Sequence, residues 1–361
     1  MQRKFKIYKA LLPLSWLYGS IVFLRNKLFD WSILPSESFD IPVISIGNLS
    51  VGGTGKTPHT EFLIRLLSKK YKVAVLSRGY KRKTKGFLLA DEKANAQTIG
   101  DEPFQMHRKF SEIIVAVDAN RRRAIRLLLQ EKPDVILLDD AFQHRFVKPS
   151  LSILLTDSNR PFWEDKLLPA GRLREPASCC KRADILIVTK NSEQLRITNY
   201  ELRITTIFSI FNSRFIYRGL LPVFPEFSTV KKENIERLKK ELYSFLVITG
   251  LANPKPLIEY LKNYTTDLQS MVYSDHHDFN RNDVIRIQRT FQTIENQHKI
   301  IITSEKDAVR LQHNPFITDE IKSHIYYLPI EVAFCSDKEE HSFISKIENH
   351  VKEFTRNRIL A

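Results

Sequence analysis

The sequence predicts an α/β fold, with a large parallel-sheet domain followed by a second, smaller α/β domain. Three observations lead to this prediction. Apolar β-branched runs alternate with helical apolar spacing between residues 42 and 188, a glycine-rich loop joins the first strand to the first helix, and the alternation returns between residues 245 and 330. Strands and helices that alternate in this way form a parallel sheet covered on both faces.

The expected elements follow one another in a regular order. Buried parallel strands are short runs rich in Val, Ile and Leu, and such runs lie at 42–49, 73–76, 113–117, 135–138, 151–155 and 185–188. Apolar residues three and four positions apart indicate helices at 57–69, 102–110 and 121–130. In the smaller domain, the same signals give strands at 245–249, 300–303 and 325–330 and helices at 256–263 and 306–311.

Length and rhythm together suggest the domain boundaries. At roughly 150 residues per domain, 361 residues correspond to two domains. We expect an N-terminal interfacial helix in 1–30, the large sheet domain in 31–190, a connection in 191–240 where the alternation is lost, and the smaller domain in 241–361.

The composition restricts the partners and the compartment. Lys and Arg outnumber Asp and Glu by 56 to 41, and a net charge of +15 predicts an anionic partner: nucleic acid, a phospholipid surface or a phosphorylated substrate. The three cysteines, Cys179, Cys180 and Cys335, cannot form a disulfide framework, which favours a reducing compartment.

The N-terminal segment is basic and apolar. Six basic side chains and no acid lie between residues 3 and 27, and they flank an apolar stretch over 10–24. Fifteen helical residues span about 22 Å, less than the roughly 30 Å hydrocarbon core of a bilayer. No small-residue cleavage site follows Leu24, which counts against a secretory signal. An interfacial helix fits best, and a helix packed on the protein's own core stays open as the alternative.

The glycine-rich segment after the first strand has the pattern of a phosphate-binding loop (P-loop), as in P-loop NTPases. Its residues are Ser50, Val51, Gly52, Gly53, Thr54, Gly55, Lys56 and Thr57. The glycines let backbone N–H groups surround phosphates, Lys56 supplies charge to the β- and γ-phosphates, and the Thr57 hydroxyl is suited to Mg²⁺. The usual first glycine is Ser50 here.

An acidic pair ends the fourth expected strand. Asp139 and Asp140 follow Val135 to Leu138, and carboxylates at such a strand end are placed to hold Mg²⁺ directly or through water. Membrane-associated partitioning ATPases share a Gly-Gly-x-Gly-Lys-Thr loop, but they carry an extra lysine where this chain has Val51.

Further motifs resemble the tetraacyldisaccharide 4′-kinase (lipid A 4′-kinase) family. They are Gly52 to Pro58, Ser77-Arg78-Gly79-Tyr80, Gly100-Asp101-Glu102-Pro103, Asp139 to His144, Leu168 to Pro176, Asp275 to Phe279 and Thr303 to Val309. They keep the family's order from about residue 42 to 311. One departure is Ala141, where the family usually has glycine.

The resemblance implies an activity and a location. The chain is expected to transfer the γ-phosphoryl group of ATP, with Mg²⁺, to the 4′-hydroxyl of tetraacyldisaccharide 1-phosphate, the lipid A precursor, giving lipid IVA. It is expected to act peripherally on the cytoplasmic face of the bacterial inner membrane, with no nucleic acid. The alternatives are a membrane-associated switch ATPase that phosphorylates no lipid and an ATPase that binds nucleic acid.

The resemblance also implies roles for the reacting groups. Asp101 acts as the base on the acceptor hydroxyl, His276 partners it from the smaller domain, and Lys56 completes the catalytic set. Asp275 is expected to orient the imidazole or to contact substrate. From the residues alone, Asp101 also fits a simple helix N-cap.

The remaining expected site residues bind metal or substrate. Thr57, Asp139, Asp140 and Glu175 are the expected Mg²⁺ ligands, although Glu175 also fits a salt bridge with Arg172 or Arg174. The expected substrate contacts are Arg78, Arg121, Gln143, His144, Arg174 and Asp275. The sequence does not indicate which of Arg121, Arg122 and Arg123 points inward.

Overall fold

The computed structural model describes residues 7–191, 209–228, 230–275 and 277–360, and the chain divides into two compact units. The first unit contains Met1–Phe215 and Val332–Ala361, and the second contains Ile216–Glu331. Parallel strands with helices on both faces make up each unit, which confirms the predicted α/β fold.

A nine-stranded sheet forms the centre of the first unit, in the order β14-β8-β7-β6-β1-β5-β2-β4-β3. Neighbouring strands pair in parallel in the part of the sheet that has the order β8-β7-β6-β1-β5-β2-β4, and the edge strand β3 is antiparallel to β4. The bounds are β1 Val43–Asn48, β2 Val73–Ser77, β3 Leu88–Leu89, β4 Ile114–Val117, β5 Val135–Asp139, β6 Leu151–Asp157, β7 Ile185–Thr189, β8 Ser209–Tyr217 and β14 Ile330–Phe334.

Helices cover both faces of this sheet. Ile44 and Ile46 of β1 pack in one core with residues of α2 and α11, whereas Val43 packs in the opposite core with residues of α5. The bounds of the helices are α1 Leu12–Asp30, α2 Lys56–Leu67, α3 Ala96–Ile99, α4 Asp101–Lys109, α5 Arg121–Leu128 and α11 Asp337–Leu360, with 3-10 turns at η1 Lys9–Leu11, η2 Leu129–Glu131, η3 Phe162–Glu164 and η4 Ala177–Arg182.

The second unit has its own five-stranded sheet, in the order β11-β10-β12-β13-β9. Its central strands are parallel, and β9 is antiparallel to β13. The bounds are β9 Leu221–Pro222, η6 Pro225–Phe227, α6 Ile235–Lys240, β10 Ser244–Thr249, α7 Lys255–Leu261, β11 Leu268–Val272, α8 Arg281–Gln292, β12 Lys299–Ser304, α9 Glu305–Gln312, α10 Asp319–Lys322 and β13 Ile325–Leu328.

The division of the chain differs from the boundaries expected from the sequence. The second unit begins at Ile216, inside the expected connection, and the last thirty residues of the expected smaller domain return to the first unit. The cause is α11, whose Phe343, Ile347 and Val351 are buried in a core of the first unit. Apolar residues four positions apart predict a helical face but not which core receives it. Part of the expected connection, 192–208, lies outside the described residues.

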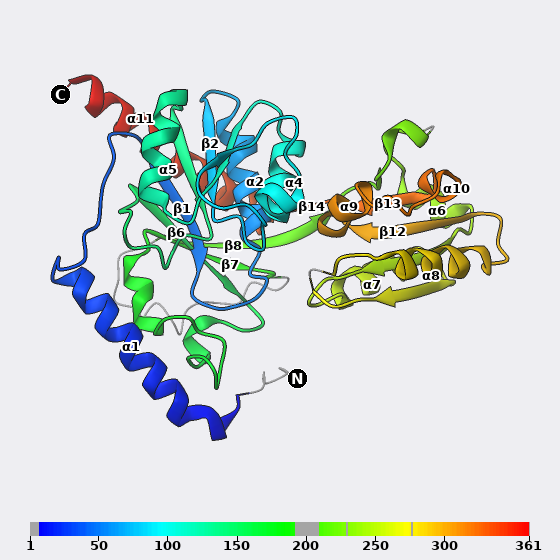
Figure 1. Ribbon diagram of the computed structural model, residues 1–361, viewed down its shortest axis with the longest axis horizontal. Coiled ribbons are helices and arrows are strands. Elements are labelled where there is room, and N and C mark those ends of the chain that lie inside the picture. The colour runs from blue at the N-terminus through cyan, green and yellow to red at the C-terminus, as the bar shows by residue number, and fades with distance from the viewer. Residues whose placement is uncertain (1–6, 192–208, 229, 276, 361) are drawn as a thin grey trace. The chain divides into compact units, whose positions relative to one another are not determined.

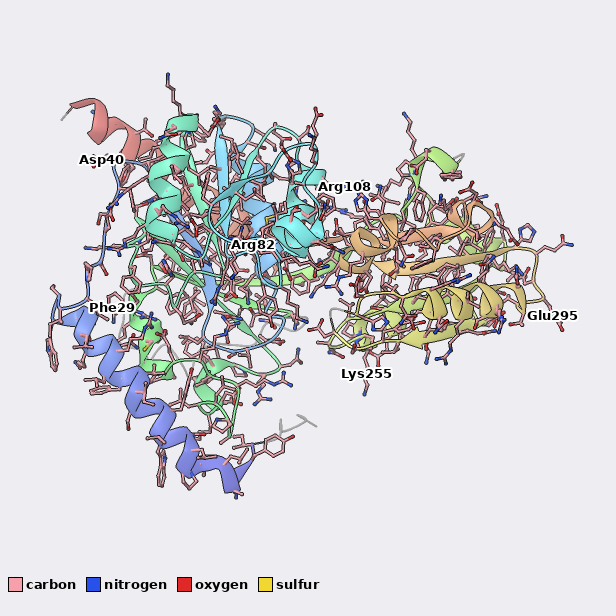
Figure 2. The ribbon with its side chains drawn as sticks, in the orientation of Figure 1. Phe29, Asp40, Arg82, Arg108, Lys255 and Glu295 are labelled. Atoms are coloured by element: carbon pink, nitrogen blue, oxygen red, sulfur yellow. The ribbon has the colours of Figure 1, made fainter. Side chains whose placement is uncertain are left out.

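The helix α1 presents most of its large apolar side chains away from the protein. Its buried residues are Ser15, Val22, Asn26 and Phe29. The side chains of Leu14, Trp16, Leu17, Ile21, Phe23 and Leu24 are each more than half exposed. Figure 1 shows α1 alongside the green segment between β6 and β7, and Figure 2 labels Phe29 near its C-terminal end. Among the described residues, no helix has the length and hydropathy needed to span a membrane.

Candidate active site

The P-loop joins β1 to α2 through two glycines with left-handed backbone. Gly52 has φ of 115° and Gly55, the N-cap of α2, has φ of 89°, conformations that other residues rarely adopt. A Cβ atom on Gly55 would lie 2.4 Å from the Phe215 ring. Inside the loop, the Asn48 amide donates to the Thr54 hydroxyl at 2.7 Å. These contacts fix the shape of the loop that leads into the N-terminus of α2, and a helix N-terminus at the end of a glycine-rich loop is suited to bind phosphate.

A second segment, residues 168–176, runs beside the P-loop. Val51 N donates to the Arg172 carbonyl at 2.8 Å, Arg174 N donates to the Leu49 carbonyl at 2.7 Å, and Ser50 forms an antiparallel bridge with Leu173. This pairing brings Arg174 to the nucleotide loop although the two are more than a hundred residues apart in the sequence.

The acidic pair lies beside the P-loop lysine, as the strand pattern predicted. Parallel pairing of β5 with β1 sets Asp139 opposite Ile46. Asp140 Oδ1 lies 3.4 Å from Lys56 Nζ and 3.2 Å from Arg174 Nη1. Asp140 has φ of 47°, while Ala141 keeps an ordinary negative φ. The left-handed residue is thus Asp140, so alanine in place of the family's glycine requires no unusual backbone at 141.

The pKa values of the two carboxyl groups are shifted in opposite directions. Burial, and next the negative charge of Asp140, raises the pKa of Asp139 to about 7. Burial also acts to raise the pKa of Asp140, but Lys56 and Arg174 outweigh it and hold the Asp140 pKa below its usual value. The Thr60 hydroxyl donates to Asp139 at 3.2 Å. Asp139 is buried and Asp140 is partly exposed, and a bound cation stabilises two neighbouring carboxylates of this kind.

These donors fit Mg²⁺ in the form in which proteins usually bind it. Asp139, Asp140 and the hydroxyl of Thr57 offer hard oxygen ligands, and Mg²⁺ normally takes only one or two carboxylates, with water and phosphate completing its shell. Accordingly, no cluster of three His, Cys, Asp or Glu side chains suited to a metal occurs in the described part of the chain.

Glu175 has other partners than the acidic pair. Its buried carboxylate pairs with Arg182 and lies 3.7 Å from Arg25 Nη1. Its contacts therefore give no support to the expected metal role, and they differ from the salt bridges with Arg172 or Arg174 considered above.

The motifs Ser77–Tyr80 and Gly100–Pro103 come close together at their glycines. Gly79 has φ of 67° and Gly100 has φ of 94°. A Cβ atom on Gly79 would lie 2.9 Å from the Ile99 carbonyl, and one on Gly100 would lie 3.2 Å from Gly79 Cα. The exposed Arg78 is thereby brought to the N-terminus of α4.

Asp101 occupies the first turn of α4. The N-cap is Gly100, so Asp101 is the first helical residue rather than the cap. Its side chain is buried, and the field at the helix N-terminus stabilises a carboxylate there. The neighbouring Glu102 contributes to raising the pKa of Asp139, which places this end of α4 within electrostatic reach of the acidic pair.

Among the three consecutive arginines of α5, only Arg121 points inward. It is buried, and its pKa falls to about 10, first through burial and then through the positive charge of Arg78. Arg122 lies over the Phe146 ring, and Arg123 pairs with Asp118. Within the described residues, Arg121 Nε has no hydrogen-bond partner.

Gln143 and His144 follow the acidic pair directly. Gln143 Nε2 donates to the Asn48 carbonyl at 2.7 Å, and its Oε1 accepts from Arg174 at 3.4 Å. Burial, and next the charges of Arg121, Arg25, Arg122 and Arg78, lowers the pKa of His144 to about 4. His144 Nε2 makes no hydrogen bond to the part of the chain that the structure describes. Neutral imidazole among several arginines is an environment that favours an anion.

In the second unit, contacts around His277 fix the segment that carries Asp275. His277 Nε2 lies 2.8 Å from Asp283, the ring stacks on Tyr273, and Arg310 donates to the His277 carbonyl. Asp275 pairs with Lys306 at 3.5 Å. His276 itself lies outside the described residues, so its expected role stays a prediction.

Two P-loop contacts were not expected from the sequence. His59 is buried in α2, with Nδ1 2.7 Å from the Gly55 carbonyl and Nε2 2.9 Å from Ser213 Oγ. Lys190, which follows β7, donates to the Gly53 carbonyl at 2.7 Å. A histidine directly after Gly-Lys-Thr-Pro was the available signal for the first, but its distant partner was not visible in the sequence.

Comparisons with known proteins give a consistent result. A family model described as Tetraacyldisaccharide-1-P 4′-kinase matches residues 7–352. Tetraacyldisaccharide 4′-kinases of Bacteroides thetaiotaomicron and Parabacteroides distasonis are each 48% identical over 98% of this chain, covering 95% and 97% of their own lengths. A crystal structure of LpxK from Aquifex aeolicus in complex with ATP matches with a TM-score of 0.73 and 30% identity, over 95% of this chain and 99% of that one.

Proposed function

The chain belongs to the tetraacyldisaccharide-1-phosphate 4′-kinase family, and on this premise we propose that it transfers the γ-phosphoryl group of ATP to the 4′-hydroxyl of tetraacyldisaccharide 1-phosphate, giving lipid IVA. It is an ATP-dependent kinase of lipid A biosynthesis, and a switch ATPase is not favoured. The observation that carries the proposal is the placement of Asp140, which lies within 3.4 Å of both the P-loop lysine and Arg174.

In the proposed reaction, Asp101 takes the proton of the 4′-hydroxyl. The 4′ oxygen then bonds to the γ-phosphorus, the bond from that phosphorus to the β,γ-bridging oxygen breaks, and ADP leaves. Lys56 and the N-terminus of α2 bind and orient the phosphates. Mg²⁺, held by Thr57, Asp139 and Asp140, would neutralise phosphate charge when bound. His276 stays the expected partner of Asp101, with Asp275 beside it in the sequence.

The environment of His144 supports an anion site for the 1-phosphate of the substrate. Arg78 and Arg121 supply charge there, and Arg121 Nε, which has no hydrogen-bond partner among the residues that the structure describes, supplies a donor. Guanidinium groups bind phosphate through pairs of parallel hydrogen bonds, so two arginines suffice to select a phosphorylated disaccharide over an unphosphorylated one.

The apolar outer face of α1 supports a peripheral position on a membrane, which we propose to be the cytoplasmic face of the inner membrane. A helix that exposes Trp16, Leu17 and Ile21 to water leaves a large apolar surface uncovered. Lying in the headgroup region would cover it, and basic residues would meet anionic lipids.

The decisive assay is incubation of the purified chain with labelled ATP, Mg²⁺ and tetraacyldisaccharide 1-phosphate, followed by thin-layer separation. We expect label in a new, more highly phosphorylated glycolipid. ATP turnover without labelled lipid would overturn the proposal and favour the switch ATPase.

The role of Asp101 is tested by Asp101→Asn, which keeps the size of the side chain but removes the base. We expect a loss of turnover of about 10² to 10⁴, with nucleotide binding retained. Turnover close to that of the unaltered enzyme would exclude Asp101 as the base.

A further inference from the structure

The inner face of α1 binds backbone carbonyls of two active-site residues. Tyr18 Oη donates to the Arg174 carbonyl at 2.7 Å, and Arg25 Nη2 donates to the Gln143 carbonyl at 2.9 Å. Tyr18 and Arg25 lie seven positions apart, which is two helical turns, so both project from the same side of α1.

The side chains of the two residues held in this way contact each other, and that of Arg174 also contacts Asp140. Arg174 Nη1 donates to Asp140 at 3.2 Å and to Gln143 Oε1 at 3.4 Å. Their backbones are thus tied to α1, and their side chains form the network that holds Asp140. Asp140 in turn lies beside Lys56. A continuous series of contacts therefore connects α1 with the P-loop lysine.

Neighbouring contacts fix the register of α1 on the same loops. Ser15 Oγ donates to the Leu167 carbonyl and accepts from Ala170 N, each at 3.0 Å. A Cβ atom on Gly19 would lie 2.8 Å from Leu167, so the helix backbone comes close to that loop. Glu175 lies between Arg25 and Arg182.

Besides these polar contacts, the attachment includes the buried Val22 and Phe29, and the Phe29 ring packs on that of Phe146. The buried apolar clusters of the described residues contain none of the side chains of α1. The hydrogen bonds of Tyr18 and Arg25 add to contacts that already hold the two loops, such as Arg174 N to the Leu49 carbonyl and Gln143 Nε2 to the Asn48 carbonyl. A change in these two bonds of α1 is therefore expected to shift the Arg174 and Gln143 backbones without unfolding either loop.

We propose that Tyr18 and Arg25 are positioning residues for phosphoryl transfer: through the backbones of Arg174 and Gln143 they set the place of Asp140. In this way α1 helps to position Asp140, in addition to any contact that its apolar outer face makes with lipid. This inference rests on the proposed function for its activity readout, but not for its nucleotide-binding readout.

The test uses the full chain with Tyr18→Phe, which removes only one hydroxyl, and Arg25→Gln, which removes the guanidinium. Lys27→Gln is the matched control, because Lys27 lies on the same helix and its ion pair is with Asp30, 3.8 Å away on that helix. Each variant is assayed with tetraacyldisaccharide 1-phosphate in phospholipid-detergent micelles, and binding of a fluorescent ATP analogue is measured at increasing Mg²⁺ concentration.

We expect kcat to fall about threefold in Tyr18→Phe and about tenfold in Arg25→Gln. The Mg²⁺ concentration that gives half of the maximal nucleotide binding rises in both variants, while their binding to phospholipid vesicles equals that of the unaltered chain. The control Lys27→Gln equals the unaltered chain in kcat and in Mg²⁺ dependence. Arg25→Lys, which keeps the charge, restores part of the loss.

Unaltered kcat and unaltered Mg²⁺ dependence in Tyr18→Phe would overturn the inference, whatever the folding of Arg25→Gln. Loss of vesicle binding with unaltered kcat in micelles would do the same, since α1 would then act only as an anchor. If the unaltered chain labels no lipid, the proposed function fails, and the Mg²⁺ dependence of nucleotide binding still decides on the positioning role.

Discussion

The two terminal helices of the first unit, α1 and α11, differ in where most of their large apolar side chains lie. α11 turns Phe343, Ile347 and Val351 into the core and leaves lysines outside. α1 buries the polar Ser15 and Asn26 together with Val22 and Phe29, and leaves most of its large apolar side chains outside. An amphipathic helix in water packs its apolar face on the protein, so α11 has the arrangement of an ordinary surface helix and α1 has the inverse.

The difference teaches that the apolar content of a helix does not decide its environment. Both helices offer several large apolar residues, and only the direction of the apolar face relative to the rest of the protein separates them. The inverse arrangement of α1 leaves its polar side chains free to bind the loops of the active site, a role that α11 has no means to perform.

The largest expected difference between the helices is in stability. Phe343→Ala leaves a cavity in the core and should lower the free energy of unfolding by about 3–5 kcal/mol. Ile21→Ala on the exposed face of α1 should change it by no more than about 0.5 kcal/mol. Urea unfolding followed by circular dichroism measures both. Similar losses in the two variants would show that α1 also packs on a core.

The next difference is in vesicle binding. Ile21→Asp places a charge on the proposed lipid-facing side of α1 and should lower partition into phospholipid vesicles about tenfold, equivalent to about 1.4 kcal/mol. Ser345→Asp adds the same charge at an exposed position of α11 and should leave partition unchanged. Sedimentation with vesicles gives both values, and equal effects would mean that only net charge matters.

The sequence predicted those parts of the site that are encoded locally. The P-loop and the acidic pair at the end of β5 were found because glycines, a lysine and a strand end occur in fixed order over a few residues. The parallel pairing of β5 with β1 then brings Asp139 and Asp140 beside the P-loop without any further information from the sequence.

Other features depend on partners that are distant in the sequence. The first 3.6-residue turn of α5 decides that Arg121, and not Arg122 or Arg123, faces the site, and this requires the position of the helix on its sheet. The partners of Glu175 come from α1 and η4. Likewise, β8 and β14 were not expected, since strand bounds at the edge of a sheet depend on pairing as much as on composition.

The smallest difference between the helices is in their response to pH. His350 of α11 lies 2.9 Å from Ser150 Oγ, and burial lowers its pKa against the opposing charges of Asp184 and Glu353. Because the pKa of the folded state is below that of the unfolded state, the unfolded chain binds more protons as the pH falls below about 6.5, and stability is lost there. His350→Gln should reduce the loss of stability between pH 7.5 and 5.5, measured by urea unfolding at each pH.

α1 contains no histidine, so partition of the unaltered chain into zwitterionic vesicles should stay constant over the same range. A partition that changes with pH as stability does would show that α1 leaves the membrane only when the first unit unfolds, and would remove the independence of the two helices on which the comparison depends.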